Sequence, residues 1–483
     1  MNTIPYTLIL HILVVFVMGL RILYRRMAVN TTLAWIIIIA AFPVGGVVFY
    51  FLFGDHRLGR KRLKLGPRIR QYYQSAYDIS ADDEGGSPIA PFFEDLSQIV
   101  AIETGFHSSV GNKIKLFDEA GHILTALITD IENAKETCFL EFYIIQEHGR
   151  VESVLKALED AADRGVDCRV LADDIGSRDF LKSVRCDQLI QSGVKVERSL
   201  EVGIIKSFSK RTDLRNHRKL VIIDQSIGYV GSFNLVDPVI FKAEADIGQW
   251  VDIMARVEGH IASSMAVVFN TDYIFDTTDG DYSQATLSQF SHKAAPEEFD
   301  QDTVLQLIPS GPEMRTSLIY EIIVAALFGA RESITIVTPY FVPDEALVLG
   351  LSNAARRGIK VTIILPRRLD SIMARYASES VYETLLDAGV KILLFQKGML
   401  HTKAILIDDT ISFIGTVNMD MRSFYLNLEV TLAVYDKSFA LRLSETIDHY
   451  KSRSTPLDLD VWVNRSSVKK FKENILRLAT PLL

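Results

Sequence analysis

The chain has 483 residues, and at about 150 residues per domain this length predicts two or three units rather than one small core. Hydrophobic residues make up 48% and charged residues 23%, which excludes a disordered chain and makes a membrane segment the first feature to seek. The net charge of −8 argues against a protein that coats nucleic acid, and three cysteines without a C-x-x-C pair predict neither a disulfide framework nor a zinc site.

Two apolar stretches predict a transmembrane hairpin over residues 1–54, with spans at about 4–24 and 33–53. Each stretch holds about 20 residues, enough for a helix to cross a hydrocarbon core of about 30 Å. Pro43 and Gly46 predict a kink or a close helix contact inside the second span. One alternative is a buried hairpin in a soluble core. Another is a cleaved signal peptide, although small residues for a cleavage site are missing.

A basic segment follows, and we expect residues 55–105 to join the membrane to the globular part. Its cations are Arg57, Arg60, Lys61, Arg62, Lys64, Arg68 and Arg70. By the positive-inside rule, the long C-terminal part then faces the cytoplasm. The same cations would suit anionic lipid headgroups, and a merely solvated surface is the equal alternative.

Residues 106–300 and 301–483 are predicted to be two copies of one α/β unit. The stretch 192–196 recurs at 388–392, and in each copy a helical pattern ends at glycine before a strand. The first copy holds an insertion around 197–214, for which a gating loop and a neutral surface loop are both open. Apolar residues at helical spacing predict a C-terminal amphipathic helix that either lies in the membrane interface or packs on the domain. They are Phe471, Ile475, Leu478 and Leu482.

Each copy carries the same motif, H-x-K-x4-D followed by G-[ST]-x-N. In the first copy it is formed by His217, Lys219, Asp224, Ser232 and Asn234. In the second copy it is formed by His401, Lys403, Asp408, Thr416 and Asn418. One match would arise by chance in a few per cent of chains, whereas two with the same downstream pattern are far rarer. His449 and Lys451 give an internal control, because neither the Asp nor the glycine pattern follows them.

Strand geometry assigns roles to these positions. Residues two apart on a strand face the same side, so the His and Lys of each motif can converge on one phosphate. The Asp follows the His by seven residues, an odd separation that turns it away, and we expect it to be structural or to support the site indirectly. The hydroxyl and amide residues after the glycine offer hydrogen-bond donors to phosphate oxygens.

A phosphodiester displacement needs a nucleophile, a proton donor for the leaving alkoxide, and cations around the developing negative charge. Two histidines and two lysines meet these needs without a metal. One imidazole must be neutral and the other protonated, which an ordinary histidine pKa of about 6.5 permits. One copy alone therefore supplies half a site.

With this paired motif the sequence resembles the phospholipase D superfamily and, within it, the bacterial cardiolipin synthases. The stretches that carry the narrower resemblance are 215–219, 233–238, 248–259, 338–343 and 415–423. The resemblance implies two tandem phospholipase D-like α/β domains packed around one shared site, after an N-terminal two-helix transmembrane hairpin. It also implies a multi-pass protein of the bacterial inner (cytoplasmic) membrane with cytoplasmic catalytic domains.

The resemblance further implies a reaction in which one histidine attacks phosphatidylglycerol, giving a phosphatidyl-histidine and glycerol. A second phosphatidylglycerol then accepts the phosphatidyl group to form cardiolipin. By analogy with superfamily members in which the first motif attacks, His217 is the expected nucleophile, and His401 the general acid and then base. Asp252 and Glu429 match acidic positions that orient the histidines, each serving the ring of the opposite copy.

The expected partners are phosphatidylglycerol and other anionic membrane lipids, with no cofactor, metal or nucleic acid, and a homo-oligomer is left open. Tyr340 and Phe341 would suit a rim where acyl chains leave the bilayer, with core packing as the alternative. The nearest alternative function is a hydrolytic phospholipase D, in which water captures the same intermediate. A phosphodiester nuclease and a non-catalytic membrane scaffold are less favoured, because of the apolar hairpin and the two intact motifs.

Overall fold

The computed structural model describes residues 6–25, 29–51, 60–77, 89, 91–201, 214–245, 247–278, 303–312, 314 and 317–477. Some sequence-based expectations lie outside these residues. They concern Arg57, most of the linker before residue 91, the middle of the insertion around 197–214, and Leu478 and Leu482.

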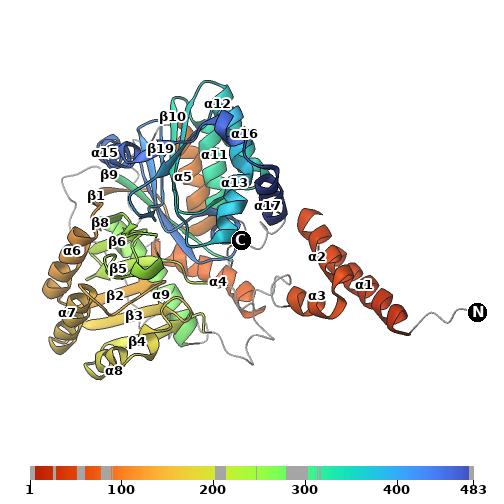
Figure 1. Ribbon diagram of the computed structural model, residues 1–483. Helices are drawn as coiled ribbons and strands as arrows, with labels where there is room; N and C mark the ends of the chain where they lie inside the picture. Colours follow the sequence, from red (N-terminus) through yellow and green to blue (C-terminus); the bar gives the residue numbers. More distant parts are fainter. Residues whose placement is uncertain are drawn as a thin grey trace, which may run out of the picture.

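Three helices at the N-terminus lie beside the globular body (Figure 1). They are α1 (Tyr6–Tyr24), α2 (Val29–Ala41) and α3 (Pro43–Phe49). Among the described residues, α1 is the one helix long and apolar enough to cross a membrane. The second predicted span is not one uninterrupted helix: α2 stops before Pro43, because proline lacks an N–H and disfavours helical geometry in the residue before it.

The expected kink and close contact are both confirmed in this region. The kink falls at Phe42, whose backbone leaves helical geometry between α2 and α3. A Cβ atom on Gly46 would lie 2.8 Å from the Cα of Ile39, so only glycine fits where α3 folds back on α2. The buried residues that hold the three helices together are Met18, Ile22, Trp35, Ile39 and Tyr50.

Two linking helices and the first α/β copy follow in chain order. The helices are α4 (Arg60–Tyr77) and α5 (Pro91–Thr104). The first copy consists of β1 (Ser109–Phe117), α6 (Ala120–Asn133), β2 (Thr137–Phe142), α7 (Val151–Asp163), β3 (Asp167–Asp173), α8 (Val184–Gln191), β4 (Lys195–Ser199), β5 (Lys219–Ile223), β6 (Ile227–Gly231), β7 (Trp250–Val251), β8 (Met254–Glu258) and α9 (His260–Thr277).

The second copy repeats this order with small additions. It consists of β9 (Thr303–Ser310), α11 (Leu318–Gly329), β10 (Ser333–Val337), β11 (Phe341–Val342), α12 (Glu345–Arg356), β12 (Lys360–Pro366), α13 (Ile372–Asp387), β13 (Lys391–Phe395), β14 (Met399–Leu400), β15 (Ala404–Ile407), β16 (Ile411–Gly415), β17 (Met419–Asp420), α14 (Met421–Tyr425), β18 (Glu429–Val434) and α15 (Lys437–Ser452). The chain then forms β19 (Ser454–Pro456), α16 (Leu459–Val463) and α17 (Ser467–Arg477).

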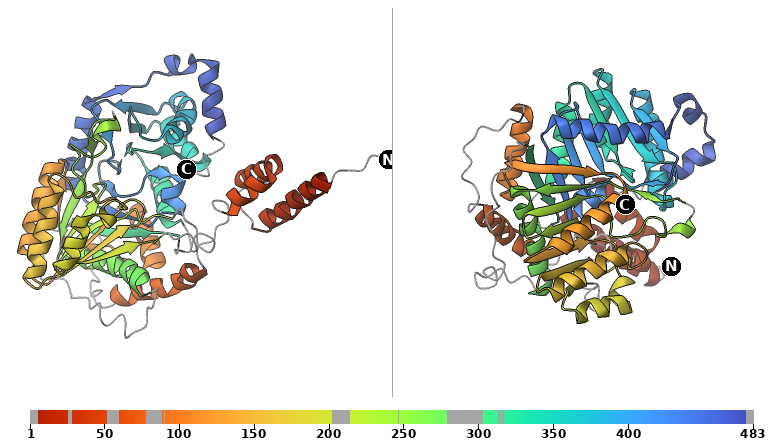
Figure 2. Two further views of the ribbon diagram at one scale, coloured as in Figure 1. Left: turned by 60° about the horizontal axis from the view of Figure 1, so that its bottom comes forward. Right: turned by 90° about the vertical axis from the view of Figure 1, so that its left-hand side faces the viewer.

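One continuous 15-stranded sheet runs through both copies of the described chain, in the order β19-β13-β12-β10-β15-β16-β18-β9-β1-β8-β6-β5-β2-β3-β4. The antiparallel pair β1 and β9 joins the two halves at its centre. The two views in Figure 2 show the halves side by side with helices on both faces of the sheet. The motif strands β5 and β15 lie inside the sheet, away from its two edge strands, and their residues are buried throughout.

Three hydrophobic clusters fill this fold. One packs α6, α7 and α8 against the first half of the sheet, and a second packs α5, α11 and α12 against the other half. The third lies at the junction and contains residues of both copies, among them Phe269 of α9, Leu305 of β9 and Leu443 of α15. Because this core is shared, the two copies are held in a fixed relative position, and with them the two motifs.

The C-terminal helix α17 packs on α13 of the second copy, which is one of the two positions that the sequence left open. Lys469 lies 3.1 Å from Glu379, and Arg465 lies 2.7 Å from Glu383. Its apolar side chains nevertheless stay exposed, 65% for Phe471 and 48% for Ile475. The helix is therefore bound to the domain through ion pairs and turns its apolar stripe outward.

Candidate active site

Each motif histidine stands just before a central strand and is held there by backbone of the opposite copy. The His217 N–H donates to the Leu428 carbonyl at 2.9 Å, and the His401 N–H donates to the Val251 carbonyl at 2.8 Å. The short parallel pairing of β14 with β7 supports the second of these contacts. The exchange of backbone contacts brings the two motifs to the junction of the copies.

The histidine rings also contact a carboxylate from the other copy. His217 Nδ1 lies 2.9 and 3.0 Å from the two carboxylate oxygens of Glu429, and His401 Nδ1 lies 2.7 Å from Oδ1 of Asp252. All four side chains are buried. A carboxylate can only accept, so each Nδ1 carries the hydrogen and each Nε2 is left for chemistry. The sequence-based pairing of these acids with the opposite rings agrees with this geometry.

The two lysines lie beside the histidines. Lys219 Nζ donates to the His217 carbonyl at 2.7 Å, and Lys403 Nζ donates to the His401 carbonyl at 2.6 Å. Burial lowers the pKa of Lys219 to about 8 and holds the pKa of Lys403 well below its usual range. These ammonium groups each have further donors for an anion, and a bound phosphate would favour their charged form.

Burial dominates the titration of both histidines. It lowers the pKa of His217 to about 4 and that of His401 to about 3, against the opposing pull of Glu429 and Asp252. Each lysine also depresses the pKa of the histidine in the other copy, so the two motifs form one electrostatic cluster. Both imidazoles are therefore neutral at pH 7 in the empty site.

The residues after the motif glycines divide into two kinds. Ser232 Oγ donates to Asp252 at 2.6 Å, and Thr416 Oγ1 donates to the Val430 carbonyl at 3.2 Å, so the hydroxyls contact the acid Asp252 and the backbone beside Glu429. The amides are different. Asn234 Nδ2 and Asn418 Oδ1 are buried without a hydrogen-bond partner among the described residues, which leaves a donor of the first copy and an acceptor of the second copy available to a ligand.

Asp224 and Asp408 do not contact the histidines. The Asp224 carboxylate accepts the backbone N–H groups of Lys135, Glu136 and Thr137 at 2.8 to 2.9 Å, directly before β2. Asp408 does the same for 331–333 before β10, also at 2.8 to 2.9 Å. The motif groups Asp224 and Asp408 with the catalytic His and Lys, but these contacts agree with the structural role that the odd spacing predicts.

Replacing Asp224 by alanine tests this structural role. The change leaves three backbone donors without their charged acceptor, and we expect it to lower the free energy of unfolding by about 2 kcal/mol. The catalytic rate per folded molecule should stay at the wild-type value. Denaturant unfolding and a rate normalised to folded protein measure the two quantities. A large loss of rate without a loss of stability would return Asp224 to the catalytic set.

Sequence reasoning missed three neighbours of the histidines. The fully buried Arg218 donates from Nε to the Glu429 carbonyl at 3.0 Å and forms an ion pair with Asp272, so it fixes the segment that carries the acid. The Trp250 ring lies 4.1 Å from that of His401, and the Tyr143 ring lies 5.0 Å from that of His217. Arg218 occupies the variable position of the motif, where the other copy has Thr402, so spacing alone gives no signal for it.

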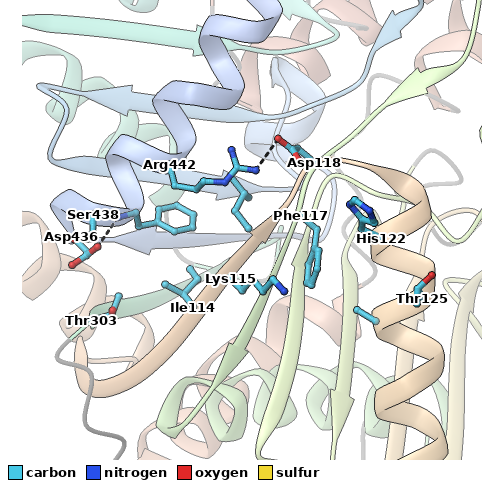
Figure 3. A pocket seen from close by; sticks show the side chains of 13 residues that line it. Ile114, Lys115, Phe117, Asp118, His122, Thr125, Thr303, Asp436, Ser438 and Arg442 are labelled. Atoms are coloured by element: carbon cyan, nitrogen blue, oxygen red, sulfur yellow. Dashed lines mark hydrogen bonds and ion pairs between the residues drawn. The ribbon is translucent and has the colours of Figure 1, made fainter.

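A cavity of about 970 Å³ lies apart from these residues, beside β1 and α15 (Figure 3). Its lining includes the ion pair of Asp118 with Arg442, at 3.0 Å, and contains none of the motif residues. No group of three or more possible metal ligands occurs in the described part of the chain. The functional candidates are therefore the paired histidines and lysines, not this cavity.

Comparisons with known proteins agree with the motif. A family model described as "Cardiolipin synthase, PLD-like domain" matches residues 127–250 and 323–451, and a phospholipase D-nuclease N-terminal model matches 10–54. Cardiolipin synthase A of Proteus mirabilis (strain HI4320) is 37% identical over 468 residues, covering 96% of this chain and 95% of the relative. Cardiolipin synthase A of Klebsiella pneumoniae is 37% identical over 471 residues with the same coverage.

A solved structure shares the fold. The phosphatidylserine synthase of Haemophilus influenzae Rd KW20 matches with a TM-score of 0.58 at 16% identity, covering 78% of this chain and 97% of that one. At this identity the likeness concerns architecture alone. The repeated α/β unit is therefore found in another solved protein.

Proposed function

The chain belongs to the cardiolipin synthase family of phospholipase D-like proteins, and on this basis we propose that His217 and His401 act together on one phosphorus atom. The enzyme is a phosphatidyltransferase that makes cardiolipin. The observation that carries the proposal is the exchange of carboxylates, in which each histidine is held by an acid of the opposite copy. A pair of separate half-sites would not need that exchange.

In the first step, Nε2 of neutral His217 attacks the phosphorus of phosphatidylglycerol. The bond from phosphorus to the glycerol oxygen breaks, and His401 gives that oxygen its Nε2 proton, so glycerol leaves as the free alcohol. The Glu429 carboxylate accepts the Nδ1 hydrogen of His217 and stabilises the positive charge that the ring gains. The product of this step is a phosphatidyl-histidine.

In the second step, the terminal hydroxyl of another phosphatidylglycerol attacks the same phosphorus. His401, now neutral, takes the hydroxyl proton, and the bond from phosphorus to His217 Nε2 breaks. Cardiolipin leaves and both histidines return to their starting states. Lys219 and Lys403 neutralise the charge on the phosphate oxygens in both steps, and Asn234 Nδ2 donates to one of these oxygens.

We place this chemistry at the inner membrane of a bacterium, with the catalytic halves on the cytoplasmic side and phosphatidylglycerol as donor and acceptor. The apolar helix α1 and the match of 10–54 to an N-terminal family model support membrane attachment. The broken second stretch, α2 and α3, is proposed to complete a second crossing. Residues 68 and 70 continue the basic segment that favours this orientation.

The reaction itself is tested with purified full-length protein reconstituted with phosphatidylglycerol. We expect glycerol and cardiolipin to appear in equal amounts. Formation of phosphatidate in place of cardiolipin would identify the hydrolytic alternative, because water would then be the acceptor. Competition between phosphatidylglycerol and small alcohols would show how far the site selects its acceptor.

We expect the protein to take up a proton when it binds a phosphate ligand. In the empty site burial lowers the pKa of His401 to about 3, so its proton donor is absent at pH 7. A bound phosphate anion lies beside the imidazole and raises its pKa, because an opposite charge favours the protonated form. Titration calorimetry of a soluble phosphonate analogue of phosphatidylglycerol, in buffers of different ionisation enthalpy, should therefore report uptake of about one proton. The variant His401→Gln should lose this uptake, and its persistence there would contradict the assignment.

A further inference from the structure

Four exposed apolar side chains lie on two surface segments, one from each copy, which are joined by the contact of Lys242 with Asp370. Val239 and Ile240 of the first copy are 61% and 43% exposed. Ile372 and Met373, the first residues of α13 in the second copy, are 69% and 41% exposed. We call these four residues the apolar rim. Isolated exposed apolar residues are common on soluble proteins, but a cluster built from two separate segments marks an interaction surface.

Contacts between the flanking residues hold the two segments together. Lys242 Nζ lies 3.0 Å from Oδ2 of Asp370, and the Tyr340 hydroxyl donates to the other oxygen of the same carboxylate at 2.5 Å. Phe241 and Leu369 pack in one apolar cluster below them. Because the neighbours of the rim are anchored inside, the rim side chains point outward in a defined arrangement.

The apolar rim adjoins the motif histidines. Lys242 Nζ lies 5.4 Å from the centre of the Trp250 ring, and that ring lies 4.1 Å from the ring of His401. Two side-chain contacts therefore connect Lys242, which follows the rim residues Val239 and Ile240, with His401. Of the two residues expected from the sequence to form such an edge, Phe341 is 1% exposed and belongs to the core, and Tyr340 supports the rim from below.

Charges beside the rim favour an anionic lipid surface over a protein partner. Arg367 and Arg368 are exposed in the segment that leads into Ile372, whereas Lys242 on the other segment is paired with Asp370. An apolar patch bordered by cations matches a bilayer, since the apolar groups enter the acyl boundary and the cations meet the headgroup phosphates. In the proposed mechanism the lipid phosphate reaches the buried histidines, and its acyl chains then need an apolar surface outside the site.

We infer that the apolar rim is the surface through which the catalytic halves contact the bilayer and take lipid from it. This inference rests on the proposed function and adds a contact that the membrane helices do not supply. The occupant is the surface of a membrane that contains phosphatidylglycerol. The rim contributes to the delivery of lipid and has no part in the chemical steps.

The kinetic test compares two forms of the same substrate. Full-length enzyme in phosphatidylcholine vesicles receives phosphatidylglycerol either within the bilayer or as a monomeric short-chain analogue. The double variant Ile240→Ser/Ile372→Ser is expected to lower kcat/KM for bilayer substrate about tenfold and to leave the rate on the monomeric analogue unchanged. The control Val184→Ser/Ile190→Ser alters a similarly exposed pair on α8, at the outer edge of the sheet, and should change neither rate.

The possible results distinguish a failure of the rim inference from a failure of the proposed function. If the wild-type enzyme makes cardiolipin from neither substrate, the proposed function fails. If the wild type is active and the rim variant matches it on both substrates, or loses both rates equally, the rim inference fails while the function stands. A rim variant that instead changes the mass of the solubilised oligomer would identify a protein interface and also overturn the inference.

A second readout does not depend on activity. The native Cys138, Cys168 and Cys186 are buried, so a cysteine introduced at position 240 or 372 can be labelled selectively with an environment-sensitive fluorophore. Lipids that carry a quencher on the acyl chain should quench the probe in Ile240→Cys and Ile372→Cys. The probe in Ile190→Cys on α8 should stay bright. Equal quenching at all three positions, or none at the rim, would overturn the inference.

Discussion

The variant His217→Ala is expected to lower cardiolipin formation by about 10⁴-fold or more, because it removes the atom that bonds to phosphorus. No other described side chain can replace it, since His401 is held by Asp252 in a different position. His401→Ala should be similarly inactive on phosphatidylglycerol, where glycerol needs a proton to leave. The overall rate alone therefore does not distinguish the two histidines.

A donor with a weakly basic leaving group separates their roles. Phosphatidyl p-nitrophenol can expel its alcohol without a proton donor, so His401→Ala should release a burst of about one nitrophenolate per active site and then stall. His217→Ala should give no burst. The control His449→Ala changes the solvent-exposed histidine of the accidental H-x-K sequence on α15 and should behave as wild type. A burst in His217→Ala and none in His401→Ala would exchange the roles.

Replacing the acids that hold the histidine rings should also lower the rate strongly. Glu429→Gln and Asp252→Asn keep the shape of each site but allow the amide to favour the wrong imidazole tautomer, and we expect a loss of about 10³-fold in kcat. The two variants should differ with the activated donor. Glu429→Gln should slow the burst because it impairs the nucleophile, whereas Asp252→Asn should keep the burst and slow the transfer that follows.

Asp408→Asn provides the matched control for these acids. It alters a carboxylate within the motif whose partners are backbone N–H groups of 331–333 rather than a histidine. We expect a lower stability and a nearly unchanged kcat. Equal losses of kcat in Asp408→Asn and Glu429→Gln would mean that contact with the imidazole is not what gives Glu429 its importance.

The motif chemistry could be predicted from the sequence because it depends on local periodicity. Strand parity predicted that Lys219 lies with His217 and that Asp224 points away, and the contacts of both residues agree. The strand β5 itself covers only Lys219–Ile223, so His217 precedes it and Asp224 follows it in a turn with a φ of 50°. The pairing of Glu429 and Asp252 with the opposite rings came from the family resemblance. Nothing in the spacing of residues about 150 to 210 positions apart would indicate that contact.

Features that depend on packing were predicted less well. Hydropathy alone reads the second apolar stretch as one span, and only the proline at position 43 indicates that the helix is interrupted there. The two copies form one sheet because β1 pairs with β9. Nothing in the sequence of either strand indicates which strand it pairs with. For Phe341 a surface edge and core packing were both open, and it lies in the core; composition does not show which face of a two-residue strand is covered.

The most direct test of the central claim is to locate the covalent intermediate. Enzyme quenched in denaturant during turnover of phosphatidylglycerol with a labelled phosphate, then digested and sequenced by mass spectrometry, should carry the label on His217 alone. The His401→Ala enzyme treated with the activated donor should carry nearly one label per chain at the same position. Label on His401, on both histidines, or on neither would contradict an account in which two half-motifs serve one phosphorus atom with divided roles.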